Sequence, residues 1–116
     1  MADPSADELF DAIVRLFLFE HSVIVSFAAD ASVRIKIPAT RRIADFLKIP
    51  HYLVLRSLAI MENDGLVRKE ERAGIVTTDA GSRIIIRLLM TRHYTEAEAL
   101  FGPVILDELA RNAKTH

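Results

Sequence analysis

The chain has 116 residues, of which 51% are hydrophobic, and its formal net charge is −1. This composition excludes a disordered tail, and the balanced charge means that any attraction for nucleic acid has to come from local clusters of Arg and Lys. The absence of cysteine excludes disulfides and thiolate metal sites.

The first part of the chain predicts a long helix. Ser5-Ala-Asp-Glu8 has the form of a capping box, and the apolar residues after it leave only a thin polar line through Asp11 and Arg15. A helix that is apolar nearly all round has to be covered on several sides, and we expect a second copy of the chain to cover it. The β-branched run from Ser22 to Phe27 fits a helix or a strand, and we favour a helix that continues to about Ala29.

The same stretch argues against secretion and membrane insertion. Acidic residues occupy the N-terminus, where a secretory signal carries a basic segment. Ionisable residues, among them Glu20 and His21, interrupt the apolar run 9–29. We therefore expect a cytoplasmic protein without a membrane segment.

The middle of the chain predicts a strand and a short helix. Residues 32–38 alternate apolar and polar, with Val33, Ile35 and Ile37 on one side, as in a half-buried strand. Thr40 is the predicted N-cap of the helix that follows.

A second helix is predicted at about residues 50–63, after a break at Lys48-Ile-Pro50. Its inner face repeats apolar residues at helical spacing, and Asn63-Asp-Gly65 is a C-terminal stop signal. Two short strands are predicted next, at 66–69 and 74–77, around a charged turn.

The remaining residues predict further helices. Thr78-Asp-Ala-Gly81 opens a helix that runs to about Arg92, and we interpret its apolar runs as core or dimer packing rather than as the lining of a ligand pocket. Thr95-Glu-Ala-Glu98 has the form of a second capping box. The helix that it starts is interrupted at Gly102-Pro103 and resumes to Arg111.

The order of strand, helix, turn, helix, hairpin and helix resembles winged helix-turn-helix regulators. The residues of about 33–90 that match the family pattern are Ile43-Ala44, Phe46-Leu47 and Ile49 in the first helix and turn, Val54, Arg56, Leu58, Met61 and Gly65-Leu66-Val67 in the second helix and its exit, and Thr77-Thr-Asp-Ala-Gly81 at the close of the wing. With its terminal helices the chain is similar to the MarR and PadR classes of bacterial and archaeal regulators, which dimerise through such helices.

This resemblance implies a mainly α fold with a small β-hairpin wing, a winged helix-turn-helix with additional N- and C-terminal helices in one domain, 1–116. Residues 1–31 would form the N-terminal dimerisation helix, 32–81 the helix-turn-helix and wing, and 82–116 the C-terminal helices. The implied function is sequence-specific binding of double-stranded DNA by a homodimeric transcriptional regulator, with the helix at about 50–63 in the major groove.

Nine residues are candidate DNA contacts. His51, Tyr52 and Arg56 begin the second helix and are placed to contact bases, because a guanidinium matches the O6/N7 pair of guanine. Residues at the start of the preceding helix and in the hairpin are placed to contact phosphates, although Glu70 and Glu71 would repel them. This second set is Thr40, Arg41, Arg42, Arg68, Lys69 and Arg72.

One feature favours an alternative function, a winged-helix module that docks on another protein without binding DNA. Leu53, Leu55 and Ile60 cannot all be core residues of one helix, so some of them have to contact DNA, a neighbouring helix or a protein partner.

Enzyme and cofactor functions have little support. The four histidines lack the spacing of paired metal ligands, there is no Gly-x-Ser-x-Gly motif, and the glycines sit at turns rather than in a phosphate-binding loop. We expect no catalysis, no metal and no cofactor, and no pattern in the sequence identifies a small-molecule effector.

Overall fold

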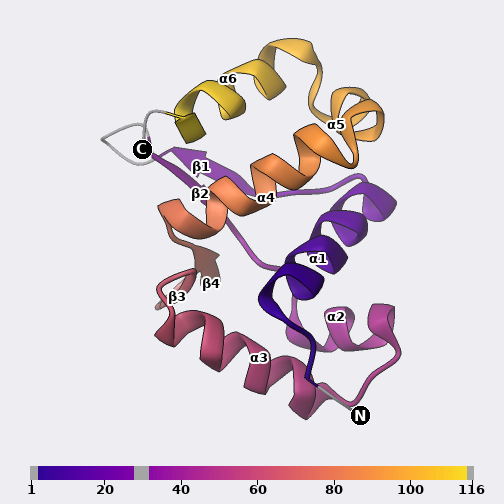
Figure 1. The fold of residues 1–116 in the computed structure, drawn as a ribbon, viewed down its shortest axis with the longest axis vertical. Helices are drawn as coiled ribbons and strands as arrows, with labels where there is room; N and C mark the ends of the chain where they lie inside the picture. The colour runs from indigo at the N-terminus through magenta and orange to yellow at the C-terminus, as the bar shows by residue number, and fades with distance from the viewer. Residues whose placement is uncertain (1–2, 28–31, 115–116) are drawn as a thin grey trace.

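The protein is mainly helical, with six helices and two short antiparallel sheets among the residues that the computed structural model describes, 3–27 and 32–114. In chain order the elements are α1 (Ala6–Glu20), β1 (Val25–Phe27), β2 (Val33–Ile35), α2 (Thr40–Leu47), α3 (His51–Asn63), β3 (Val67–Glu70), β4 (Gly74–Thr77), α4 (Asp79–Thr91), α5 (Tyr94–Phe101) and α6 (Pro103–Lys114). Figure 1 shows α3 and α6 at opposite ends of the long axis, with α1 and α4 between them.

Helix α1 is the centre of the core. The predicted capping box is confirmed: the Ser5 hydroxyl accepts a hydrogen bond from the Glu8 N–H, and the Glu8 carboxylate accepts one from the Ser5 N–H. Helices α2, α3, α4 and α5 all pack against α1, and side chains such as Phe10 and Ile13 are fully buried within one copy of the chain. The argument that α1 needs a second copy as its cover was therefore wrong, because its own chain covers it.

The chain leaves α1 earlier than predicted. The helix ends at Glu20, and His21 takes the left-handed conformation, with φ of 51°. The prediction of a helix through 21–27 was wrong: the β-branched residues there form an extended segment and β1, which pairs with β2. The rest of that predicted helix lies outside the described residues. The strand predicted at 32–38 is confirmed in β2, with Val33 and Ile35 buried.

The two middle helices form a tight pair. Lys48 has φ of 57° and turns the chain between α2 and α3. Thr40 is not the N-cap as predicted, because Ala39 holds that position and Thr40 is the first helical residue. The predicted stop after α3 is confirmed, since Gly65 has φ of 75° and lets the chain reverse into β3.

The C-terminal helices close the other side of the core. The apolar runs of α4 are core as predicted. Ile85 and Leu89 are buried and belong to the same hydrophobic core as the buried side chains of α1. The capping box predicted at Thr95 was wrong: the Ala97 N–H donates to the His93 carbonyl, so α5 starts two residues before the helix that such a box would begin. Helix α6 begins at Pro103 after the predicted break. Within residues 3–27 and 32–114, no helix combines the length and apolar character needed to cross a membrane.

Candidate nucleic-acid interface

The N-terminal ends of α2 and α3 are joined by a hydrogen bond. Thr40 Oγ1 lies 2.6 Å from His51 Nε2, and both residues are predicted DNA contacts. The structure therefore brings the start of the candidate recognition helix next to the start of the preceding helix. The first backbone N–H groups of a helix lack intrahelical partners, and an anion near a helix N-terminus is stabilised by them.

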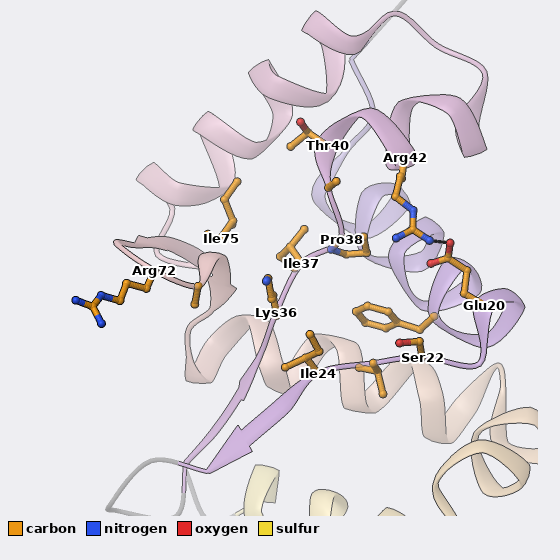
Figure 2. A pocket seen from close by; sticks show the side chains of 15 residues that line it. Glu20, Ser22, Ile24, Lys36, Ile37, Pro38, Thr40, Arg42, Arg72 and Ile75 are labelled. Atoms are coloured by element: carbon orange, nitrogen blue, oxygen red, sulfur yellow. Dashed lines mark ion pairs between the residues drawn. The ribbon is translucent and has the colours of Figure 1, made fainter.

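An open hollow of about 630 Å³ lies between the start of α2, the segment after β2 and the hairpin turn. Figure 2 shows Lys36 between Arg72 on the hairpin turn and Arg42 at the start of α2. The floor of this hollow is apolar and includes Ile37 and Ile75. Three cations and the Glu20 carboxylate thus line one concave surface, and two of the cations, Arg42 and Arg72, are phosphate contacts predicted from the sequence.

Lys36 is the residue that the sequence reading missed. Its exposed side chain follows β2, and the Lys36–Val76 bridge places that segment beside the hairpin. Among the described residues Lys36 makes no ion pair. The alternation of 32–38 places both Lys36 and Arg34 on the polar side of the strand. Only Lys36 lines the hollow, because Arg34 pairs with Asp79 away from it.

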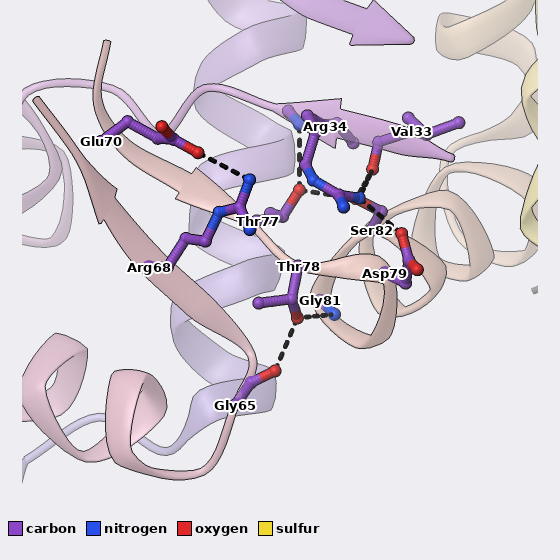
Figure 3. A network of polar contacts seen from close by, with 11 residues as sticks. Val33, Arg34, Gly65, Arg68, Glu70, Thr77, Thr78, Asp79, Gly81 and Ser82 are labelled. Atoms are coloured by element: carbon purple, nitrogen blue, oxygen red, sulfur yellow. Dashed lines mark hydrogen bonds and ion pairs between the residues drawn. The ribbon is translucent and has the colours of Figure 1, made fainter. Parts of the chain in front are cut away.

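The hairpin is attached to the core by a polar network, drawn in Figure 3. The Thr77 hydroxyl accepts a hydrogen bond from the Ile35 N–H and lies 2.6 Å from the Ser82 hydroxyl, which donates to the Val33 carbonyl. These buried bonds join β2, β4 and the start of α4. The Ile37 N–H also donates to the Ile75 carbonyl, so β4 lies between β3 and the segment that carries Lys36.

Helix α3 carries a mixed outer face. Tyr52 and Arg56 are exposed, as a base contact requires. The Arg56 guanidinium forms an ion pair with a residue distant in the sequence: it lies 3.2 Å from the carboxylate of Asp3. The Ser57 hydroxyl donates to the Pro4 carbonyl, so the N-terminal segment lies along α3.

The five positively charged candidate phosphate contacts fall into two groups. Arg42 pairs with Glu20, and Arg68 pairs with Glu70 at 2.7 Å. Arg41, Lys69 and Arg72 are exposed and have no ion pair within the described part of the chain. Exposed ion pairs contribute only about 0–1 kcal/mol, so phosphate can displace the carboxylates from the first group at little cost.

A smaller hollow of about 160 Å³ lies between α3 and the hairpin. It is lined by apolar side chains, including Leu55 and Ile75, with Arg68 and Lys69 beside them. The expectation that three apolar residues of α3 cannot share its core face is confirmed, since Leu53 is buried while Leu55 and Ile60 are 46% and 55% exposed.

No protein-family model matches this chain, and no curated protein sequence is similar to it. Within residues 3–27 and 32–114, no three His, Asp or Glu side chains come together as metal ligands would.

Proposed function

We propose that this chain is a winged helix-turn-helix domain that binds double-stranded DNA in a sequence-specific way and acts as a homodimeric transcriptional regulator. Helix α3 lies in the major groove, and the β3–β4 hairpin is the wing. The order α1, β2, α2, α3, β3, β4 and the left-handed turn at Lys48 support this interpretation, because they fit the arrangement expected of that fold.

The observation that carries the proposal is the grouping of cations around the two joined helix starts. Lys36, Arg42 and Arg72 come from three separate segments and line one hollow, together with the Glu20 carboxylate that pairs with Arg42. The hydrogen bond between Thr40 and His51 connects this hollow to the start of α3. A chain with a net charge of −1 has no general surplus of positive charge to place there. A local cluster beside a helix pair is the electrostatic pattern that attracts a phosphate backbone.

The two sets of residues have different roles in this proposal. Arg56, Tyr52 and His51 contact base edges and decide which sequence is bound. Lys36, the arginines at the start of α2 and the cations of the hairpin contact phosphates and orient the domain. If each protomer neutralises about three phosphates, the logarithm of a dimer's affinity falls with the logarithm of salt concentration at a slope near −5.

The test is a titration with sheared genomic DNA at two salt concentrations, for the wild type, Arg56→Ala and Arg87→Ala. Arg87 is an exposed arginine of α4 and serves as the matched control. We expect salt-sensitive binding and enriched fragments for the wild type and for Arg87→Ala, and loss of the enrichment for Arg56→Ala. If the wild type does not bind DNA at low salt, the proposed DNA binding is wrong.

The exposed apolar side chains of α3 favour a second candidate, a module that docks on another protein. Leu55 and Ile60 lie on the outer face of the helix, and Leu55 lines the hollow beside the hairpin. Changing both to serine separates the two functions. A DNA-binding domain largely keeps its fold and its affinity for DNA, whereas a docking module loses its protein partner.

A further inference from the structure

We propose that β1 is the edge through which two copies of this chain associate, by antiparallel pairing of β1 with its symmetry mate about a twofold axis at Ser26. This inference rests on the homodimeric part of the proposed function. It replaces α1 as the interface, because α1 is covered by its own chain.

The outer edge of β1 has unpaired backbone groups. The Ile24 carbonyl accepts a hydrogen bond from the Lys36 N–H at 2.9 Å, within the antiparallel register of β1 and β2. Hydrogen-bonded and non-hydrogen-bonded pairs alternate along such a ladder, so Ser26 also directs its backbone groups at β2, while Val25 and Phe27 direct theirs outward. Among the described residues no strand pairs with that outer side.

The two free strand edges of the chain differ in charge. Strand β3 reads Val-Arg-Lys-Glu, and charged side chains of this kind discourage pairing with another chain. Strand β1 reads Val-Ser-Phe and has neither a charge nor a proline. An edge strand without charge or proline can accept a second strand.

A hollow of about 460 Å³ adjoins this edge. It lies between β1 and the α5–α6 corner, and none of its described lining residues is Asp, Glu, Lys or Arg. Phe27 and Ile105 line it and are each 49% exposed. Depletion of charge around exposed aromatic and aliphatic side chains is typical of the centre of a protein interface.

The geometry is self-complementary, which is why the occupant is a second copy. With the axis at Ser26, Val25 of each copy faces Phe27 of the other, and their outward N–H and C=O groups pair. Both side chains line the same hollow, so the pairing also brings apolar surface from the two copies together. In Figure 1 β1 and α6 lie far from α3 along the long axis, so this dimer leaves both candidate recognition helices open.

Ser26→Cys tests the axis directly, because the chain has no cysteine of its own. The two Ser26 residues would form a non-hydrogen-bonded pair with Cα atoms about 4.5 Å apart, a separation that a disulfide spans. Under mild oxidation at micromolar concentration we expect a covalent dimer for Ser26→Cys. Ser22→Cys, an exposed position before the strand, is the control and should stay monomeric on a non-reducing gel. Equal cross-linking of the two variants overturns the proposal.

Sedimentation of Phe27→Glu provides the second measurement. We expect its dimer dissociation constant to rise at least tenfold, while Phe19→Glu, at a 77% exposed position of α1, dimerises like the wild type. A monomeric wild type, or a Phe27→Glu variant that dimerises as well as Phe19→Glu, overturns the proposal. Neither measurement contains DNA. A dimer that does not bind DNA would therefore contradict only the proposed DNA binding, and a monomer that binds DNA would contradict only the proposed interface.

Discussion

The carboxylate of Asp3 lies 3.2 Å from the guanidinium of Arg56, and this ion pair engages the only Arg or Lys side chain of α3. The pair matters for the proposed function because DNA has to compete with Asp3 for the residue that is expected to contact a base. Ser57 holds the backbone of the same N-terminal segment through its bond to the Pro4 carbonyl.

Asp3→Asn is therefore expected to raise the affinity for DNA. The gain should be about 1.5- to 5-fold, because exposed ion pairs contribute roughly 0.2–1 kcal/mol. Fluorescence anisotropy at low salt measures it. Glu96→Gln removes the same charge from an exposed position of α5 and should leave the affinity nearly unchanged. If both variants gain affinity equally, the effect is one of net charge and not of the Asp3–Arg56 pair.

Lys36→Gln is expected to weaken binding by a similar factor for every DNA sequence. Loss of one phosphate contact should reduce the steepness of the salt dependence by about 0.9 for each protomer. Arg56→Ala should instead remove the preference for particular fragments and change the salt dependence less. A Lys36→Gln variant with an unchanged salt slope would show that the hollow in Figure 2 does not receive the phosphate backbone.

Several parts of the fold that follow local rules were predictable from the sequence, although the caps predicted at Thr40 and Thr95 were wrong. The capping box at Ser5, the turn around Lys48 and the stop at Gly65 depend on residues only a few positions apart. The extended segment after His21 was not predictable, because β-branched residues fit a helix or a strand and the choice depends on pairing with β2. The cover of α1 was missed for the same reason, since it comes from helices distant in the sequence.

The candidate site shows the same division. The positions of Arg56 and Arg42 on their helices could be predicted, but their partners Asp3 and Glu20 could not, because these pairs join segments that only the folded chain brings together. Lys36 was overlooked because a strand pattern does not say which of its polar residues will face a neighbouring hairpin.

Gly81→Ala is expected to destabilise the protein strongly. An added Cβ would lie 2.0 Å from the carbonyl oxygen of Leu66, a backbone atom that cannot move aside without displacing the start of β3. We expect a loss of about 3 kcal/mol or more in the free energy of unfolding, at the upper end of overpacked sites. Gly65→Ala has open space around the new methyl and should lose only about 1–2 kcal/mol, from its left-handed backbone. Equal losses in urea unfolding would contradict the close approach at Gly81.

Phe10→Ala and Phe19→Ala compare two phenylalanines of the same helix. Phe10 is fully buried among the helices that surround α1, whereas Phe19 is 77% exposed. Phe10→Ala should lower the free energy of unfolding by about 3–5 kcal/mol, because truncation leaves a cavity in the core. Phe19→Ala should change it by less than about 0.5 kcal/mol, as at other exposed positions. Denaturant unfolding gives both values, and sedimentation of the folded proteins shows whether association has changed. If Phe10→Ala keeps its stability but loses its dimer, α1 is an interface after all and the proposed pairing of β1 has to be abandoned.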